Sequence, residues 1–449
     1  MTRALVHLPT HVALWRLSWP LIAIGLLKTS IYLVDAYWVG QLGDVELTAM
    51  GGAAFAWWIL LILSEIAGTG VQTETAQRVG AREPEAIPHI LTQGIHLSWI
   101  LSLVVMAVCW PLRSIYFDFL GFASGSAETA SGIAFLDVSL LGVFAFTLLA
   151  TITAVFRGLG DTRTALGITV FALLVNAVLD PFLILGWGVP SLGIAGAAWA
   201  TVIANIAGAA LGFGVWMHRG GRWAREAPRG HVMRRLTMVG GPVAARGVAF
   251  SMIYVALGPM INAFGSHQMA ALGVGMRIEG FAYHIGVGLS VAVTTLVGQH
   301  IGAGKPEAAR QVARRAALLG ALAMVPVAVV LYVCAPYFMA GFANEPMTIA
   351  AGSAYIRIQI WVLSFMALES VMEGAFAGTG HTMPTLWIGS LGTAARLPVG
   401  WVLAFYLGWG PTGLWWAIAL TTLAKGTLLW AWFEKGTWRT GGDEKPAPD

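Results

Sequence analysis

Long apolar runs recur along the whole chain, and short segments between them hold most of the charged residues. A helix needs about 20 mostly apolar residues to cross the roughly 30 Å hydrocarbon core of a bilayer, so each run of that length predicts a membrane-spanning helix. The pattern predicts twelve spans, at residues 14–39, 51–74, 90–111, 131–155, 164–186, 193–217, 237–264, 273–298, 313–335, 352–377, 384–408 and 411–433. We therefore expect an all-α polytopic membrane protein.

The composition agrees with a lipid environment. Hydrophobic residues make up 57% of the chain and charged residues only 11%, whereas soluble domains carry about 25% charged residues. The mean hydropathy is +0.74, and the 20 Trp suit the membrane–water interface. The basic pI of about 9.2 arises from short loops between apolar runs, so no nucleic-acid partner is expected. Cys109 and Cys334 stand alone in apolar runs, which is typical of small buried hydrophobes.

The loop charges predict an orientation. If the N-terminus is cytoplasmic, the Lys and Arg residues between the spans fall almost entirely on the cytoplasmic side, and Arg113 alone falls outside. Cytoplasmic loops of membrane proteins are enriched in Lys and Arg. We therefore expect a protein of the bacterial cytoplasmic (inner) membrane, with both termini in the cytoplasm.

The chain repeats itself. QRVGAREPEA (77–86) aligns with QHIGAGKPEA (299–308), 222 residues further on, and FRGLGDTRTAL (156–166) aligns with FAGTGHTMPTL (376–386), 220 residues further on. Because each repeat holds six spans, both repeats enter the membrane from the same side and are parallel. We predict an N-terminal bundle (1–218), a basic cytoplasmic linker (219–236), a C-terminal bundle (237–434) and a cytoplasmic tail (435–449).

Three polar residues inside the first repeat are candidates for chemistry. A charge near the bilayer centre costs about 3 kcal/mol or more, yet Asp35 and Asp180 lie within apolar runs. Their repeat counterparts are Leu257 and Gly400, so the fold itself does not require these carboxylates. Asn176 lies one helical turn before Asp180, and its counterpart in the second repeat is Arg396.

If the two carboxylates converge, they must share a proton or bind a cation, since both cannot stay ionised cheaply in a low dielectric. The alternative is a neutralised structural pair that includes Lys28. Pro181, which follows Asp180, weakens the helix and can free backbone carbonyl groups.

The second repeat contains further acids inside its spans. Glu369 and Glu373 are one helical turn apart and are consistent either with a second cation site or with salt bridges to Arg277, Arg357 or Arg396. Glu279 is included in this possible second site. Because Arg277 and Glu279 face different sides of a helix, however, the sequence favours a structural pairing elsewhere for each of them over a functional role. The lone Glu65 is consistent with either a transport role or a structural one.

No motif indicates enzymatic chemistry. RGLGDT (157–162) lacks the GK[ST] ending of a phosphate loop and follows a membrane helix instead of a strand. Its Gly and Asp-Thr predict a helix C-cap followed by an N-cap. Without a nucleotide-binding motif, an ion gradient is the expected energy source, and no cofactor is expected.

These residues together resemble the multidrug and toxic compound extrusion (MATE) transporters over essentially the whole chain. The resembling stretches are Pro20 to Asp35 with its fourteen-residue spacing, VDAYWVGQLG (34–43), VGAREPEA, RGLGDTRTAL, NAVLDPFLILGWG (176–188), GIAGAAWATVIA (193–204) and IGAGKPEA. The family implies a V-shaped pair of six-helix bundles that exports cationic, amphipathic compounds in exchange for sodium ions or protons.

Within the family the chain looks like the DinF-type branch. That branch implies a cation or proton site formed by Asp35, Asn176 and Asp180 together with Thr201, and the first three would be metal ligands if sodium is the coupling ion. The family's helix bend falls at Pro20. The NorM-type branch uses a glutamate in the seventh helix, where this chain has Arg246 and Ser251 instead.

The resemblance and the residues together predict a secondary active antiporter that works by alternating access. Tyr32, Tyr37 and Trp38 are candidate walls of the substrate chamber, because aromatic faces attract flat cations, although such residues are equally typical of lipid-facing anchors. The expected partners are small cationic or amphipathic molecules and the bilayer, and a monomer should suffice. The alternative is a flippase for a lipid-linked saccharide from the same wider superfamily; a non-transporting receptor is a weaker rival.

Overall fold

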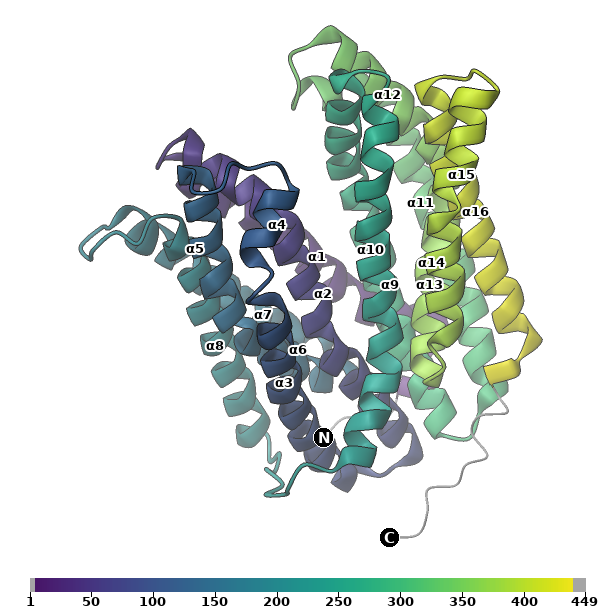
Figure 1. The fold of residues 1–449 in the computed structure, drawn as a ribbon. Helices are drawn as coiled ribbons and strands as arrows, with labels where there is room; N and C mark the ends of the chain where they lie inside the picture. Colours follow the sequence, from purple (N-terminus) through teal and green to yellow (C-terminus); the bar gives the residue numbers. More distant parts are fainter. Residues whose placement is uncertain (1–4, 439–449) are drawn as a thin grey trace. The chain divides into compact units, whose positions relative to one another are not determined.

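The computed structural model describes residues 5–438, and every regular element in that range is a helix (Figure 1). The predicted all-α class is therefore confirmed. Of the predicted cytoplasmic tail, residues 439–449 lie outside the described part of the chain. In chain order the elements are η1 (Leu5–His7), α1 (Thr10–Gly40), α2 (Asp44–Ala81), η2 (Pro84–Ala86), α3 (Ile87–Cys109), α4 (Arg113–Phe119), α5 (Ala127–Leu141), α6 (Val143–Gly158), α7 (Thr162–Leu185), α8 (Ile194–His218), α9 (Gly230–Asn262), α10 (Ser266–Gly302), α11 (Pro306–Ala340), α12 (Pro346–Gln359), η3 (Ile360–Val362), α13 (Leu363–Thr379), α14 (Met383–Ala394), α15 (Arg396–Trp401), η4 (Val402–Tyr406) and α16 (Pro411–Lys435).

The helices match the predicted spans. Within residues 5–438, eleven helical stretches are long and apolar enough to cross a membrane, and the pair α5 and α6, bent by 45° at Gly142, makes a twelfth. Several helices are longer than their apolar runs. At 1.5 Å per residue, the 38 residues of α2 span about 57 Å, which exceeds the hydrocarbon core. Hydropathy marks only the part of a helix that suits lipid, so it underestimates such elements.

The chain packs as two compact units, which we name the first bundle (residues 23–244) and the second bundle (residues 5–22 and 245–438). This division differs from the predicted one in two places. Residues 5–22, predicted in the N-terminal bundle, pack within the second bundle, where the Leu5 backbone N–H donates to Gln299 Oε1 (2.8 Å).

Residues 230–244, which include the end of the predicted linker, are the start of α9 and pack within the first bundle. There Arg235 Nη2 lies 2.7 Å from Glu74 Oε1 on α2. Hydropathy could not locate either boundary, because a helix can be apolar throughout and still divide its contacts between two cores.

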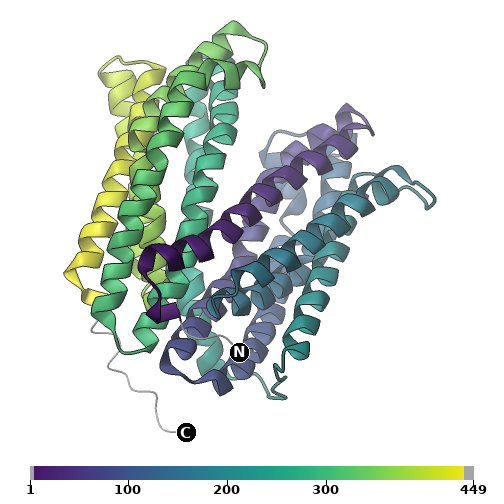
Figure 2. The same cartoon turned by 180° about the vertical axis from the view of Figure 1, so that it is seen from behind.

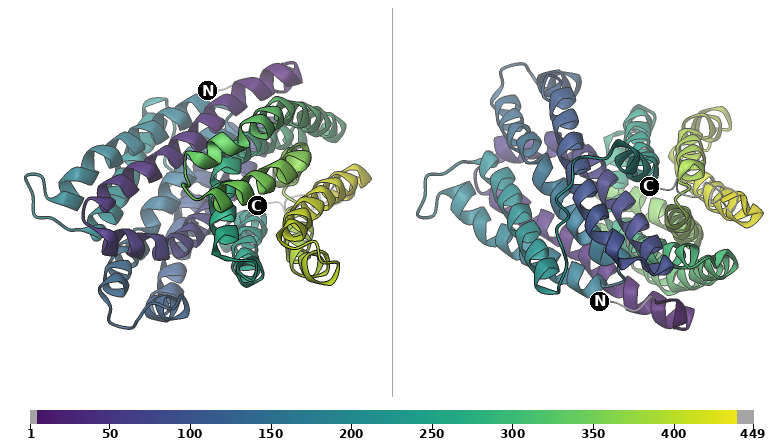
Figure 3. Two further views of the ribbon diagram at one scale, coloured as in Figure 1. Left: turned by 90° about the horizontal axis from the view of Figure 1, so that it is seen from above. Right: turned by 90° about the horizontal axis from the view of Figure 1, so that it is seen from below.

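The internal repeat is visible in the packing of each bundle. In the first bundle α2 packs along α6, and in the second α10 packs along α13. Figures 2 and 3 show the helices of each bundle from behind, from above and from below. A Cβ on Gly158 of α6 would lie 2.6 Å from the carbonyl oxygen of Gln72. A Cβ on Gly378 of α13 would lie 2.7 Å from that of Thr294. The same glycine-to-backbone contact therefore recurs at the repeat spacing.

The turn before α7 has the structure that the sequence predicts. Gly160 has a φ of 79°, a backbone conformation that glycine adopts without steric cost. The Asp161 side chain then caps α7 by accepting a hydrogen bond from the backbone N–H of Thr164 (3.2 Å). RGLGDT is thus a helix-to-helix connection.

Candidate functional site

Asp35 and Asp180 come together inside the first bundle. Asp35 lies on α1 and is 8% exposed, and Asp180 lies on α7 and is fully buried. The two side chains interact directly with each other. Two carboxyl groups that are 145 positions apart in the chain therefore form one buried pair, which meets the condition that the sequence analysis left open.

Asn176 and Thr201 complete a polar cluster around Asp180. The Asn176 Nδ2 group donates to Asp180 Oδ1 (3.3 Å) and to Thr201 Oγ1 (3.4 Å). The Thr201 hydroxyl in turn donates to the carbonyl oxygen of Ala197 one turn earlier on α8 (3.0 Å). Helical spacing on α7 sets Asn176 and Asp180 on one face, and the contact between α7 and α8 supplies Thr201.

Apart from the contact between the two carboxyl groups, three buried oxygens of this cluster have no hydrogen-bond partner. They are Asp35 Oδ1, Asp180 Oδ2 and the hydroxyl of Tyr32, which lies one turn before Asp35. Buried polar atoms are normally satisfied, and an unsatisfied one costs about 1–3 kcal/mol. Such a cluster is therefore suited to receiving a proton or a small cation.

Lys28 does not neutralise the carboxylate pair. Throughout the described chain, no Lys or Arg nitrogen lies within 4.0 Å of Asp35 or Asp180. Lys28 instead contributes to the electrostatic environment of Glu65, whose Oε2 lies 3.4 Å from Arg157 Nη2. The structure thus gives Glu65 a resident cationic partner and leaves the Asp35–Asp180 pair without one.

The donor set fits a proton or a hard cation. Carboxylate, amide and hydroxyl oxygens are the ligands that hard cations prefer, and Asp35, Asn176, Asp180 and Thr201 supply all three kinds. Residues 5–438 contain no group of three or more His, Cys, Asp or Glu side chains placed to hold a metal. A bound sodium ion would therefore depend on the Asn and Thr oxygens as well as on the carboxylates.

Two prolines lie in the helices that carry the carboxylates. Pro20 is inside α1 and Pro181 is inside α7, and both helices continue through them. A proline inside a helix removes one backbone hydrogen bond and eases bending. The predicted role of Pro20 as a bending point remains a prediction.

The aromatic candidates have different surroundings. Tyr32 packs edge-to-face against Trp57 on α2, with ring centroids 4.6 Å apart, next to Asp35. Tyr37 is 60% exposed. Trp38 packs edge-to-face against Trp187, 5.6 Å away. Tyr32 is therefore the candidate that interacts electrostatically with Asp35, and Trp57 packs against it.

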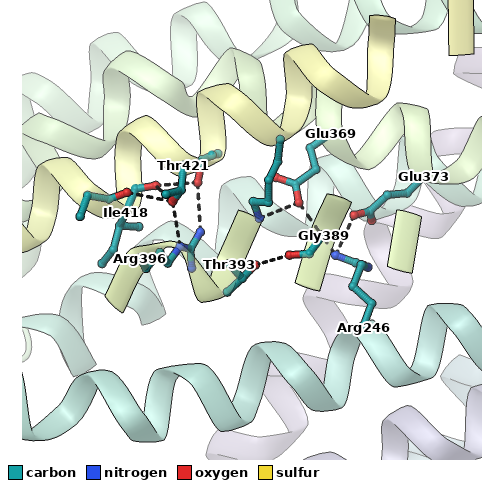
Figure 4. Close-up of polar contacts among 11 residues, drawn as sticks. Arg246, Glu369, Glu373, Gly389, Thr393, Arg396, Ile418 and Thr421 are labelled. Atoms are coloured by element: carbon teal, nitrogen blue, oxygen red, sulfur yellow. Dashed lines mark hydrogen bonds and ion pairs between the residues drawn. The ribbon is translucent and has the colours of Figure 1, made fainter. Parts of the chain in front are cut away.

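The acids of the second bundle are paired with resident cations (Figure 4). Glu369 Oε1 on α13 lies 2.7 Å from Lys425 Nζ on α16. Glu373 Oε1 lies 2.7 Å from Arg246 Nη1 on α9, and the same nitrogen is 4.0 Å from Glu369. The sequence analysis left open a second cation site or salt bridges to Arg277, Arg357 or Arg396. The structure shows salt bridges, but their partners are Lys425 and Arg246. Sequence spacing showed that the two acids share a face but not which helices that face meets.

Glu279 makes a different contact from Glu369 and Glu373. Its Oε2 accepts a hydrogen bond from the hydroxyl of Tyr355 on α12 (2.6 Å). Among the described residues, Glu279 forms no salt bridge within 4.0 Å to Arg246 or Lys425, the cations that pair with Glu373 and Glu369. Glu279 therefore belongs to a polar contact separate from the one that Glu369 and Glu373 share through Arg246.

Comparison with known proteins places the chain in a family. The sequence profile of the MatE family matches it twice, at residues 20–182 and 242–402, which reproduces the repeat spacing. The chain is 27% identical to the "Probable multidrug resistance protein NorM" of Thermotoga maritima, over 94% of this chain and 92% of that protein. It is 28% identical to the "Multidrug resistance protein NorM" of Burkholderia vietnamiensis, over 93% and 92%.

Solved structures share the fold. A crystal structure of MATE in the bent conformation superposes with a TM-score of 0.88 at 21% identity and covers 97% of this chain and 98% of that one. A structure in the straight conformation gives 0.88 at 22% identity, with 98% and 99% covered. With both repeats matched by the family profile, over well more than half of its length, the chain belongs to the MatE family.

Proposed function

We propose that this chain is a secondary active antiporter that exports cationic or amphipathic compounds in exchange for protons or sodium ions. It is an integral membrane protein by its apolar helices and its family. Its curated relatives are described as multidrug resistance proteins, which supports an efflux transporter of small molecules. The coupling site in this proposal is Asp35, Asn176, Asp180 and Thr201.

One contrast between the bundles carries the proposal. Asp35 and Asp180 form a buried pair whose side chains contact each other and which has no resident cation within 4.0 Å. Glu369 and Glu373 in the second bundle already have Lys425 and Arg246 as partners. The charged groups of Lys425 and Arg246 are part of the protein and cannot be exchanged across a membrane. A carboxylate pair without such a partner can bind a free cation and release it. The first bundle is therefore the part of the chain suited to ion exchange.

The cycle follows from the charge of the pair. A proton or sodium ion that enters from outside neutralises Asp35 and Asp180 and favours the conformation in which they lie closest. We propose that α1 then bends at Pro20 and displaces the substrate from the first bundle, and that release of the ion inside resets the site. A ligand shifts a conformational equilibrium only through different affinities for the two states, and a carboxylate pair provides this difference for cations.

The second bundle is not proposed as an exchange site. The helix α9 carries no Asp or Glu along Gly230–Asn262, so it lacks the acid that the NorM-type mechanism places there. Although the curated relatives carry the NorM name, this departure and the first-bundle carboxylates support the DinF-type branch.

The remaining properties are part of the same proposal. The excess of Lys and Arg on one side of the spans supports location in the cytoplasmic membrane with both termini inside. The coupling ion is a co-substrate, so the protein needs no bound cofactor. All four coupling residues lie in the first bundle, so we propose that a monomer suffices.

Transport in everted membrane vesicles tests the proposal. Ethidium uptake is measured with an acidic lumen and, separately, with a sodium-loaded lumen. The wild type is compared with Asp35→Asn and with the control Asp137→Asn, whose carboxylate pairs with Arg113 outside the site (2.7 Å). One gradient should drive uptake in the wild type and in the control, and Asp35→Asn should abolish that uptake.

The outcomes separate the alternatives. If Asp35→Asn transports at the wild-type rate under a full gradient, the coupling site is wrong. If the folded, inserted wild type moves no dye under either gradient, antiport of cationic compounds is wrong, and lipid-linked substrates become the next class to test.

A further inference from the structure

The two bundles contain equivalent polar contacts with opposite charge. In the first bundle Asn176 Nδ2 donates to Thr201 Oγ1 (3.4 Å). In the second, Arg396 Nε donates to Thr421 Oγ1 (3.2 Å), and both residues lie 220 positions after their counterparts. Arg396 thus stands where the first bundle has an amide of the proposed cation site.

The carboxylates of the first site are missing at the second. The counterparts of Asp35 and Asp180 are Leu257, which is buried, and Gly400. Arg396 is 3% exposed, and among residues 5–438 it forms no ion pair within 4.0 Å. A guanidinium has replaced the amide, and no carboxylate has been kept to balance it.

Nearby acids do not neutralise Arg396. Glu369 and Glu373 are paired with Lys425 and Arg246. Glu279 feels the field of Arg396, but its contact is with the hydroxyl of Tyr355 (2.6 Å). A buried charge without a close counter-charge is unfavourable, so an anion that reaches this guanidinium would be held strongly.

The contacts of Arg396 leave one nitrogen of its buried guanidinium without a hydrogen-bond partner, and Figure 4 shows its contact with Thr421. Nε is bonded to Thr421 and Nη2 to Thr422 (3.1 Å), whereas the buried Nη1 has no hydrogen-bond partner. The guanidinium carbon lies over the rings of Tyr254 (5.1 Å) and Phe250 (5.7 Å) on α9. These contacts fix the orientation of the group, and the partly exposed rings flank it.

We propose that Arg396 forms an anion-binding site in the second bundle, which takes a carboxylate or phosphate group. The planar, permanently charged guanidinium matches these groups through paired N–H donors. Thr421 and Thr422 orient it, and Phe250 and Tyr254 supply aromatic contact for the rest of an aromatic anion. The chain therefore binds compounds with an acidic group, in addition to the cations that the first bundle suits.

Equilibrium binding to the purified full-length chain in nanodiscs tests the site without any ion gradient, so the result does not depend on the coupling proposal. The probes are rhodamine B, which carries a carboxylate, and rhodamine B ethyl ester, in which that carboxylate is esterified. Fluorescence anisotropy compares the wild type, Arg396→Gln, Arg396→Lys and the control Arg357→Gln. Arg357 is an exposed arginine over Tyr332 in the same bundle.

Arg396→Gln should weaken binding of rhodamine B about tenfold or more and leave the ester within about twofold. The affinity of Arg396→Lys for rhodamine B should lie between those of the wild type and Arg396→Gln, because lysine keeps the charge but lacks the paired N–H donors of the guanidinium. The affinity of Arg357→Gln should resemble that of the wild type. Glu279→Gln should tighten rhodamine B binding, because it removes a competing negative charge.

Thermal unfolding distinguishes the source of the anion. Sodium benzoate and inorganic phosphate should raise the unfolding temperature of the wild type if free anions also bind, and this rise should be smaller in Arg396→Gln. An anion-dependent rise with no discrimination between the rhodamines supports a site for free anions. If Arg396→Gln does not fold, benzoate titration of the wild type and of Thr421→Val decides. If neither the rhodamine pair nor benzoate and phosphate respond to the loss of Arg396 or Thr421, the site does not exist and Arg396 only joins helices.

Discussion

Asn176 and Arg396 occupy equivalent positions in the two repeats, and each donates a hydrogen bond to the equivalent threonine, Thr201 at 3.4 Å and Thr421 at 3.2 Å. The helix pairs that carry them are thus built on one plan, while the charge that they present is different. Two repeats can share the same backbone packing and still differ in the ions that they suit, because only a few polar positions determine the charge inside each bundle. This asymmetry agrees with the proposal that ion exchange belongs to the first bundle, which rests on the carboxylate pair without a resident cation.

Removal of the Thr201 hydroxyl should weaken ion coupling without abolishing it. In Thr201→Val the Asn176 amide loses one acceptor, and a buried unsatisfied polar group costs about 1–3 kcal/mol. The ion concentration that gives half-maximal ethidium uptake should rise roughly tenfold, while Asp35→Asn should show no ion-driven uptake. Thr427→Val on α16, whose hydroxyl is exposed, serves as the control, and equal uptake curves for Thr201→Val and wild type would argue against a role for this hydroxyl.

Breaking the buried ion pair of the second bundle should destabilise the protein. Lys425→Met leaves Glu369 buried without its 2.7 Å partner, and loss of one member of a buried pair costs about 3–5 kcal/mol. The double variant Lys425→Met/Glu369→Gln should recover much of this loss. Thermal unfolding in detergent measures the effect, with Lys435→Met at the exposed end of α16 as the control. If the double variant is no more stable than Lys425→Met, the ion pair is not the cause.

The glycines at the helix contacts should not tolerate a methyl group. Gly158→Ala and Gly378→Ala would each place a Cβ within 2.7 Å of a backbone carbonyl oxygen, and overpacking of this kind costs about 1–3 kcal/mol. Gly167→Ala, where no heavy atom lies within 4 Å, should be neutral or stabilising by up to about 1 kcal/mol. Unfolding temperatures of the three variants provide the comparison, and similar values for all three would contradict the close packing.

The aromatic pair next to Asp35 should contribute to cation binding. Tyr32 and Trp57 lie edge-to-face with ring centroids 4.6 Å apart, and a cation over an aromatic face gains about 0.5–2 kcal/mol. Trp57→Ala should therefore weaken ethidium binding roughly three- to thirtyfold by anisotropy. Tyr37→Ala, at an exposed ring, should have a smaller effect, and the reverse order would move the substrate-binding surface to Tyr37 and Trp38.

The sequence was sufficient for the membrane class, the spans and the repeat, because all three depend on local composition and on comparison of the chain with itself. It also pointed to Asp35 and Asp180, since a carboxylate in an apolar run is costly and the repeat counterparts, Leu257 and Gly400, show that the fold does without one. The cap at Asp161 was predictable for the same reason, because a helix N-cap involves residues only three positions apart.

Only the tertiary structure decided which charges are paired. Lys425 lies 56 positions after Glu369, and Arg246 lies 127 positions before Glu373, so no periodicity along the chain connects them. Likewise, residues 5–22 and 237–244 are ordinary helical segments in sequence, yet each packs in the bundle that hydropathy did not assign to it. Hydropathy and helical periodicity determine which residues leave water and which share a face. The partner that a face meets depends on how the helices pack, and that determines whether a buried carboxylate is already neutralised or remains open to an ion.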